Sequence, residues 1–167
     1  MEYIKVIVDP EVQKAYLYES DKLVKEYLVS TGKAGLGCEE GSGKTPTGIF
    51  KVEAKYGDRA DKGAVFSSRE LTGETWDNNP NNPLNQGENA DKGLVLTRIL
   101  WLGGIEEHNA STIGRYIYFH GTRYEEKLGT PNSAGCINMS NEDIIDFYNR
   151  VPLFARVEIL DKPYNKC

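Results

Sequence analysis

The chain has 167 residues, of which 39% are hydrophobic, and this length is that of one ordinary domain with enough apolar residues for a core. We therefore expect one folded domain over residues 1–167 and exclude a disordered chain. Twenty Lys and Arg against 25 Asp and Glu give a net charge of −5 with no basic cluster, which argues against a nucleic-acid partner. No apolar stretch approaches the roughly 20 residues that span a bilayer, so no membrane span is expected.

Segments with alternating β-branched and aromatic residues, typical of strands, dominate the chain. They are expected at residues 3–8, 14–19, 23–31, 48–56, 94–102, 116–120 and 154–160. One helix is expected after Ser140, which can cap its N-terminus with Asp143 three residues on, and Pro152 ends it. The predicted fold class is therefore mainly β with one or two helices.

Two loop regions interrupt this pattern. Residues 31–47 are rich in glycine, which indicates unusual backbone angles. Residues 57–93 are polar, and we interpret them as a polar loop inserted into the domain. Structureless loops of this length are uncommon in compact domains, so 57–93 is either a tolerated surface insertion or a lid over a site.

The N-terminus lacks the features of a secretory signal, because Glu2, Lys5 and Asp9 interrupt its apolar residues. We therefore expect a cytoplasmic protein if Met1 is the native start. The periplasm or the cell wall is the alternative if a signal peptide was removed.

Three cysteines, Cys38, Cys136 and Cys167, are too few for a disulfide scaffold, and we expect three free thiols. Cys38, Cys136 and His120 can be imagined around a metal ion, but their spacing lacks the closely paired ligands typical of zinc. No metal and no other cofactor are therefore expected.

The motif Gly41-Ser42-Gly43-Lys44-Thr45 resembles the end of a phosphate-binding P-loop. The first glycine of that motif is missing, since Cys38 stands in its place. Pro46 also disfavours a helical conformation at Thr45, and residues 47–52 look like a strand. A glycine-rich turn between strands is therefore favoured over nucleotide binding.

The strongest candidate for chemistry lies between residues 116 and 139. A predicted strand ends at His120, and the small residues Ser133-Ala134-Gly135 precede Cys136. An imidazole can take the proton of a thiol, and the N–H groups of such a turn can point at a developing oxyanion. The pattern indicates cysteine-dependent acyl transfer, and the alternative is a buried cysteine beside a hydrogen-bonded histidine.

The stretch from His120-Gly121-Thr122 to Ser133-Ala134-Gly135-Cys136-Ile137-Asn138-Met139 resembles the L,D-transpeptidase (YkuD-type) catalytic domain. Residues 29–33 with 44–50, and the closing strand at 154–159, agree with the same family. The resemblance implies that domain's β-sandwich or barrel fold. It also implies that Cys136 is the nucleophile, which forms a thioester, and that His120 is the base.

The resemblance further assigns roles around these two residues. The oxyanion hole is expected from the backbone N–H groups of Ala134, Gly135 and Cys136, with Ser133 shaping the turn. Substrate contacts are expected from Gly121, Thr122 and Asn138. Many members have a second histidine where this chain has Ala134, so His120 must act alone or with a backbone carbonyl that orients it.

The implied partners are tetrapeptide stems of peptidoglycan, cut before the terminal D-alanine, and carbapenem-type β-lactams as covalent inhibitors. Water as acceptor makes the enzyme an L,D-carboxypeptidase of muropeptide recycling, which we favour because no sequence feature identifies an acceptor site. The alternative is an L,D-transpeptidase that forms 3→3 cross-links or attaches proteins. A wall-binding module that does no chemistry is the further alternative.

Overall fold

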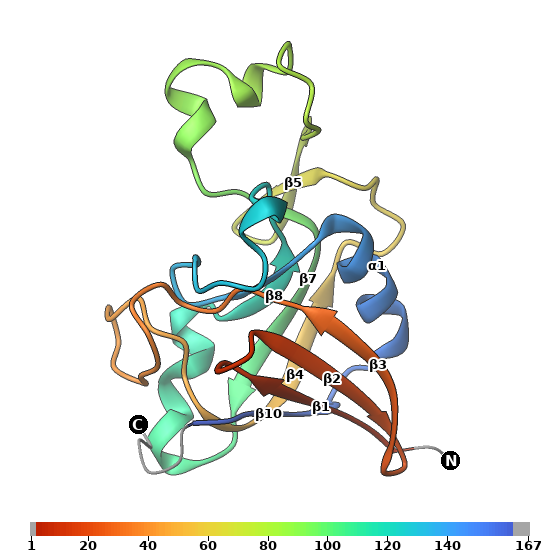
Figure 1. Ribbon diagram of the computed structural model, residues 1–167, viewed down its shortest axis with the longest axis vertical. Coiled ribbons are helices and arrows are strands. Elements are labelled where there is room, and N and C mark those ends of the chain that lie inside the picture. The colour runs from red at the N-terminus through yellow and green to blue at the C-terminus, as the bar shows by residue number, and fades with distance from the viewer. Residues whose placement is uncertain (1–2, 162–167) are drawn as a thin grey trace.

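Ten strands form one continuous, strongly bent sheet in the computed structural model, which describes residues 3–161 (Figure 1). The strands are β1 (Ile4–Asp9), β2 (Lys14–Glu19), β3 (Lys22–Leu28), β4 (Gly48–Tyr56), β5 (Ala64–Ser67), β6 (Glu70–Thr75), β7 (Val95–Gly104), β8 (Tyr118–Gly121), β9 (Ile137–Met139) and β10 (Arg156–Ile159). Their order is β3-β2-β1-β10-β4-β7-β5-β6, with β8 pairing to β7 and β9 pairing to β8.

Helices are few in this fold. The α-helix is α1 (Asn141–Arg150), and the 3-10 helices are η1 (Pro83–Asn85), η2 (Gly87–Asp91), η3 (Glu107–Arg115) and η4 (Glu125–Lys127). Ser140 caps α1 as expected, since its Oγ accepts a hydrogen bond of 3.0 Å from the N–H of Asp143. The prediction of a mainly β fold is confirmed, and each strand expected from the sequence is present. No helix of residues 3–161 is long and apolar enough to cross a membrane.

The main hydrophobic core lies between α1 and the concave side of the sheet. Phe147 of α1 packs against Phe119 of β8, with ring centres 4.7 Å apart, and edge-on against Tyr27 of β3 at 5.3 Å. All three side chains are almost completely buried. Burial of such a ring contributes about 2–3 kcal/mol to folding, and these contacts fix β8 against the helix.

The segment 57–93 is not the structureless loop that its polarity suggests. Its first half is the β5–β6 hairpin, which joins the sheet where Val65 pairs with Leu96 of β7. Its second half contains η1 and η2, which stand beyond β5 at the top of Figure 1. Trp76 and Leu84 are buried together there. Whether the segment acts as a lid stays a prediction.

A single arginine fastens the second half of this segment to the sheet. Arg123 is 6% exposed and lies two residues after the end of β8. Its guanidinium donates hydrogen bonds to the carbonyl oxygens of Leu84, Asn89 and Lys92 and to Oδ1 of Asn85. Because each is a charge-assisted bond, Arg123 holds η1 and η2 in place.

The cysteines differ from the expectation of three free thiols. Cys38 is disulfide-bonded. Cys136 is free, which confirms that no disulfide blocks it. Cys167 lies outside the described residues.

We predict that Arg123→Met loosens residues 77–93 while the sheet stays folded. Loss of its charged hydrogen bonds should accelerate amide hydrogen exchange there by about 10- to 100-fold. Exchange measured by mass spectrometry checks this, with Arg59→Met as the control because the Arg59 side chain is 93% exposed. Unchanged exchange in 77–93 would show that Arg123 is not the fastening.

Candidate active site

The parallel pairing of β8 and β9 brings the predicted thiol and imidazole together. Phe119 pairs with Ile137, and His120 pairs with Asn138. Phe119 and Ile137 both belong to the main core, so alternate residues on these strands point to the opposite face. Cys136 directly precedes Ile137 and therefore shares that opposite face with His120. Extended by one residue, the register places Cys136 opposite Tyr118, which is two residues before His120 on the same face of β8.

The His120 imidazole is held in the form that a general base requires. Its Nδ1 lies 2.7 Å from the carbonyl oxygen of Gly121. A carbonyl can only accept, so Nδ1 carries the proton and Nε2 keeps its lone pair. Burial lowers the pKa of His120 to about 4, although the Gly121 hydrogen bond opposes this shift. The expectation that a backbone carbonyl orients His120 is confirmed, and the ring is neutral at neutral pH.

The Cys136 thiol is held by the main chain that leads into β8. Its Sγ accepts from the N–H of Tyr118 and donates to the carbonyl oxygen of Tyr116, both at 3.4 Å. Burial raises the pKa of Cys136 to about 11, while the Tyr118 N–H and the charge of Arg115 act in the opposite direction. The resting pair is therefore a protonated thiol beside a neutral imidazole.

Ser133 shapes the turn before Cys136, as expected. Its Oγ accepts from the N–H of Gly135 at 3.1 Å and donates to the carbonyl oxygen of Cys136 at 2.5 Å. Gly135 has a φ of 125°, which glycine adopts far more readily than other residues. Of the three N–H groups expected in the oxyanion hole, that of Gly135 is bonded to Ser133, and the oxyanion hole itself stays a prediction. Within residues 3–161 the N–H groups of Ala134 and Cys136 have no acceptor.

Thr45 sets the direction of the peptide group that joins Gly135 to Cys136. Its fully buried hydroxyl accepts from the N–H of Gly32 at 2.7 Å and donates to the carbonyl oxygen of Gly135 at 2.9 Å. The C=O and N–H of a trans peptide point in opposite directions. Fixing the Gly135 carbonyl therefore turns the Cys136 N–H away from Thr45.

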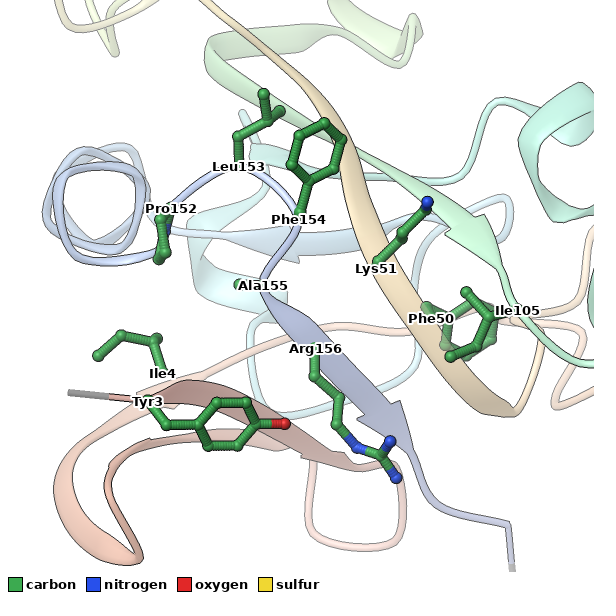
Figure 2. Close-up of a pocket in the computed structure, with 10 residues that line it drawn as sticks. All are labelled: Tyr3, Ile4, Phe50, Lys51, Ile105, Pro152, Leu153, Phe154, Ala155 and Arg156. Atoms are coloured by element: carbon green, nitrogen blue, oxygen red, sulfur yellow. The ribbon is translucent and has the colours of Figure 1, made fainter. Parts of the chain in front are cut away.

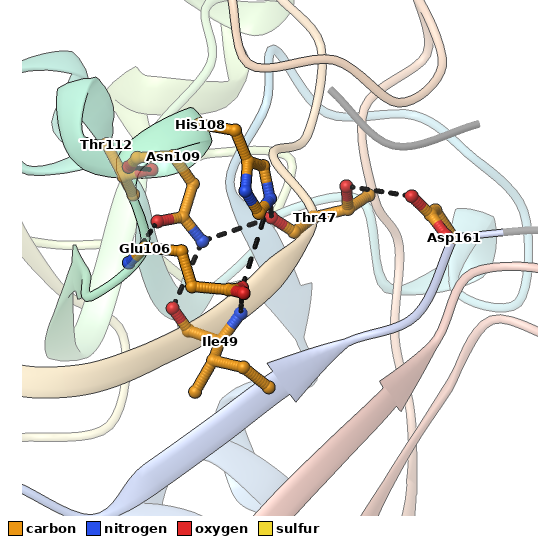
Figure 3. Close-up of polar contacts among 7 residues, drawn as sticks. All are labelled: Thr47, Ile49, Glu106, His108, Asn109, Thr112 and Asp161. Carbon is orange, nitrogen blue, oxygen red and sulfur yellow. Dashed lines mark hydrogen bonds and ion pairs between the residues drawn. The ribbon is translucent and has the colours of Figure 1, made fainter. Parts of the chain in front are cut away.

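The chain after Thr45 is anchored by the network in Figure 3. Buried Asn109 donates from Nδ2 to the carbonyl oxygens of Thr47 (3.1 Å) and Ile49 (3.0 Å), and Glu106 accepts from the N–H of Ile49 at 2.7 Å. His108 lies in the same network, with Nε2 3.2 Å from the Thr47 carbonyl oxygen. The second histidine of the chain thus supports the start of β4.

Two of the three expected substrate contacts, Gly121 and Thr122, are buried and closely packed. Thr122 is 3% exposed, and its Oγ1 accepts from the N–H of Tyr124. A side chain at Gly121 would collide with the carboxamide of Asn141 and the carbonyl oxygen of Leu96. The Gly121 carbonyl holds the His120 ring. Substrate contact by Gly121 and Thr122 stays a prediction.

Asn138 is the expected substrate contact that keeps a free polar group. Its main chain pairs with Ser30, as donor at 2.8 Å and acceptor at 3.0 Å. Its Oδ1 is buried and has no hydrogen-bond partner among residues 3–161. Because Asn138 pairs with His120 in register, this acceptor lies on the face of the thiol and imidazole.

The role of Arg115 could not be predicted from the sequence, because Arg115 belongs to no recognisable motif. Its guanidinium donates to the carbonyl oxygens of Gly37 and Lys44 and to the Ser42 hydroxyl. It thereby holds the glycine-rich segment against the end of η3. A cavity of about 380 Å³ lies between these two elements and reaches Ala134. The P-loop-like motif therefore lines a pocket beside the catalytic turn.

Another groove, of about 510 Å³, contains none of the predicted site residues (Figure 2). It lies beside β1, β4 and β10, and its apolar walls include the exposed rings of Tyr3 and Phe154. No three His, Cys, Asp or Glu side chains of the described chain are arranged to hold a metal ion. The thiol–imidazole pair is thus the centre of the candidate site.

Comparisons with known proteins agree with this geometry. Residues 4–159 match the family model described as YkuD, L,D-transpeptidase catalytic domain. Putative L,D-transpeptidase YqjB of Bacillus subtilis is 27% identical over 156 residues, which are 93% of this chain and 70% of that protein. Probable L,D-transpeptidase ErfK/SrfK of Escherichia coli is 33% identical over 97 residues, 57% of this chain but 30% of that protein.

Solved structures share the fold at low sequence identity. An L,D-transpeptidase from Mycobacterium smegmatis has a TM-score of 0.56 at 16% identity, over 96% of this chain and 59% of its own. L,D-transpeptidase 3 from Mycobacterium tuberculosis, in complex with a faropenem-derived adduct, has a TM-score of 0.60 at 16% identity. The match covers 96% of this chain and 61% of that chain. The chain thus spans about three fifths of these structures.

We predict that alkylation of Cys136 by iodoacetamide rises with pH up to an inflection at about 11, because burial holds the thiol protonated. The rate can be followed by mass spectrometry of the Cys136 peptide. A rate that is high and constant between about pH 5 and 8 would instead indicate a resting thiolate–imidazolium pair.

Proposed function

The chain belongs to the L,D-transpeptidase catalytic domain family, and from this premise we propose that it is a cysteine acyltransferase acting on peptidoglycan tetrapeptide stems. The observation that carries the proposal is the pairing of β8 with β9, which puts Cys136 on the same face as a His120 whose Nε2 is unprotonated. A thiol, a positioned base and a free backbone N–H are the parts that acyl transfer requires.

In the proposed first half-reaction, Sγ of Cys136 attacks the carbonyl carbon that precedes the terminal D-alanine. Nε2 of His120 accepts the thiol proton as the S–C bond forms, because a free thiolate is disfavoured by burial. The carbonyl oxygen becomes an oxyanion and accepts a hydrogen bond from the Cys136 N–H. The C–N bond then breaks, His120 returns the proton to the leaving amine, and a thioester remains.

In the second half-reaction an acceptor attacks the thioester carbonyl. His120 takes a proton from that acceptor and returns it to the departing sulfur, which restores the thiol. We propose water as this acceptor, which makes the reaction an L,D-carboxypeptidase reaction. Ala134 and Cys136 keep solvent exposure, so water has access to the thioester.

Transpeptidation is the second candidate. An amine must bind next to the thioester to compete with concentrated water. The cavity between the glycine-rich segment and η3, which reaches Ala134 and contains Arg115 and Glu40, is a place where it can do so. A wall-binding module without chemistry is disfavoured, because it needs neither the His120 tautomer nor the free N–H.

β-Lactams provide a test that does not depend on the acceptor. LdtMt1 has been solved in complex with imipenem, and L,D-transpeptidase 3 carries a faropenem-derived adduct. We propose that carbapenems acylate Cys136 here in the same way that the stem peptide does. Intact-mass analysis after incubation with imipenem should show one adduct, and Cys136→Ala should show none.

We predict that Cys136→Ala and Cys136→Ser each abolish turnover of a tetrapeptide muropeptide while the fold is kept. His120→Ala should reduce turnover by a factor of about 10³ or more, because the two residues act as a unit. Its Cys136 thiol should also alkylate more slowly at pH 7, because the base is lost. Liquid chromatography with mass spectrometry follows the products, and circular dichroism controls for folding.

The products distinguish the candidates. Tripeptide and D-alanine should dominate. Cross-linked dimers or D-amino-acid exchange products at millimolar tetrapeptide would instead establish transpeptidation. If neither hydrolysis nor transpeptidation products nor an imipenem adduct form, although Cys136 is reduced and can be alkylated, the wall-binding module without chemistry would be favoured.

We predict that Thr45→Val slows acylation of Cys136 by imipenem by about 10-fold or more, because the Cys136 N–H loses its fixed direction. Alkylation by iodoacetamide forms no oxyanion and should stay within about 3-fold of the wild-type rate. Thr45→Ser should restore acylation, since it keeps the hydroxyl.

The matched control for Thr45 is Thr112→Val. Thr112 is also fully buried, and its hydroxyl donates to the carbonyl oxygen of Asn109 at 2.7 Å. It should lower stability without changing the ratio of acylation to alkylation. Equal loss of both rates in Thr45→Val would mean that Thr45 only maintains the fold.

A further inference from the structure

The tip of the β5–β6 hairpin places Arg69 beside the residues that hold Cys136. The hairpin turns through Ser68 and Arg69, whose φ angles of 49° and 67° are those of a tight two-residue turn. Phe66 is 6% exposed and packs with Ile99 and Tyr118. Burial of the Phe66 side chain, three residues before Arg69, therefore fixes the position of the tip.

The Arg69 guanidinium lies against three aromatic rings. Its Nη1 donates to the hydroxyl of Tyr118 at 3.0 Å, and its Cζ lies 4.7 Å from the ring centre of Trp101 and 5.2 Å from that of Tyr116. Tyr116 and Tyr118 are the residues whose main chain contacts Sγ of Cys136. Arg69 therefore touches the side chains of both residues that hold the nucleophile.

Arg69 is a cation without a carboxylate. No ion pair within residues 3–161 includes it, and the Tyr118 hydroxyl occupies one of its N–H donors. The edge formed by Nε and Nη2 makes no hydrogen bond to any residue between 3 and 161 and has the geometry for a bidentate carboxylate. Arg115 differs, because carbonyl oxygens and a hydroxyl already engage its guanidinium.

We propose that Arg69 binds the C-terminal carboxylate of the substrate and makes the site selective for peptides that end one residue after the scissile bond. This inference rests on the proposed function. In a tetrapeptide stem the free carboxylate of D-alanine lies one residue from the carbonyl that Cys136 attacks. The aromatic rings around Arg69 keep it in place and partly exclude water, which strengthens a charge-assisted hydrogen bond.

The test is a double-mutant-type cycle in which Arg69 and the C-terminal carboxylate of the substrate are changed separately and together. The kcat/KM of wild type and Arg69→Gln is measured on the tetrapeptide as free acid and as C-terminal carboxamide. Wild type should prefer the acid by about 10- to 100-fold, and Arg69→Gln should lose this preference through a slower reaction with the acid alone. Arg59→Gln, in the same segment but 93% exposed, should behave as wild type.

Two results would overturn the role of Arg69. An equal fall for both substrates would mean that Arg69 only holds the hairpin, and an unchanged preference would mean that another group reads the carboxylate. Binding to Cys136→Ala, measured by calorimetry, gives a second readout, and the acid should bind more tightly than the carboxamide. If wild type cleaves neither peptide, the proposed function fails. If, in addition, Cys136→Ala binds the acid no more tightly than the carboxamide, the role of Arg69 fails as well.

Discussion

The pairing of β8 with β9 is the interaction on which the candidate site depends. Both strands are short, and residues 122–136 separate them in sequence. Their pairing survives because Phe119 and Ile137 are completely buried in the main core. Parallel register then leaves the alternate residues, including His120 and the position of Cys136 just before β9, on the opposite face. Hydrophobic burial on one face of a strand pair thus determines the geometry of the candidate site on the other.

Some main-chain groups around Cys136 are hydrogen-bonded within the protein, and others are not. The Gly135 N–H and carbonyl bond to Ser133 and Thr45, and the Cys136 carbonyl bonds to Ser133 as well. The Cys136 N–H, like that of Ala134, has no acceptor within residues 3–161 and is thus a donor left for another partner. The groups that are paired hold this donor in a fixed direction before any ligand arrives, which is how preorganised electrostatic stabilisation works.

Most of the fold could be predicted from periodicity, because its long strands alternate and its helix carries a cap. The β5–β6 hairpin could not, since β6 is exposed along its whole length and shows no apolar pattern. The three residues of β9 are too few for a pattern, and their pairing depends on burial against distant residues. Cys136 and His120 followed from residue types and resemblance. The engaged Gly135 N–H, the Thr45 hydroxyl and buried Thr122 depend on side-chain positions that spacing does not encode.

The charges around the site bear on how a chain of net charge −5 would attract the anionic peptides that we propose as its substrates. Most of its surface repels them weakly, so attraction must be local. Arg115 and Arg69 are the cations next to Cys136 and its neighbours that we expect to supply it, and neither forms an ion pair within residues 3–161. Arg115 is engaged by carbonyl oxygens and lowers the pKa of the Cys136 thiol against the effect of burial. Arg69 keeps a free edge. One arginine therefore favours the charge that develops on sulfur, and the other is available for the charge that the substrate brings.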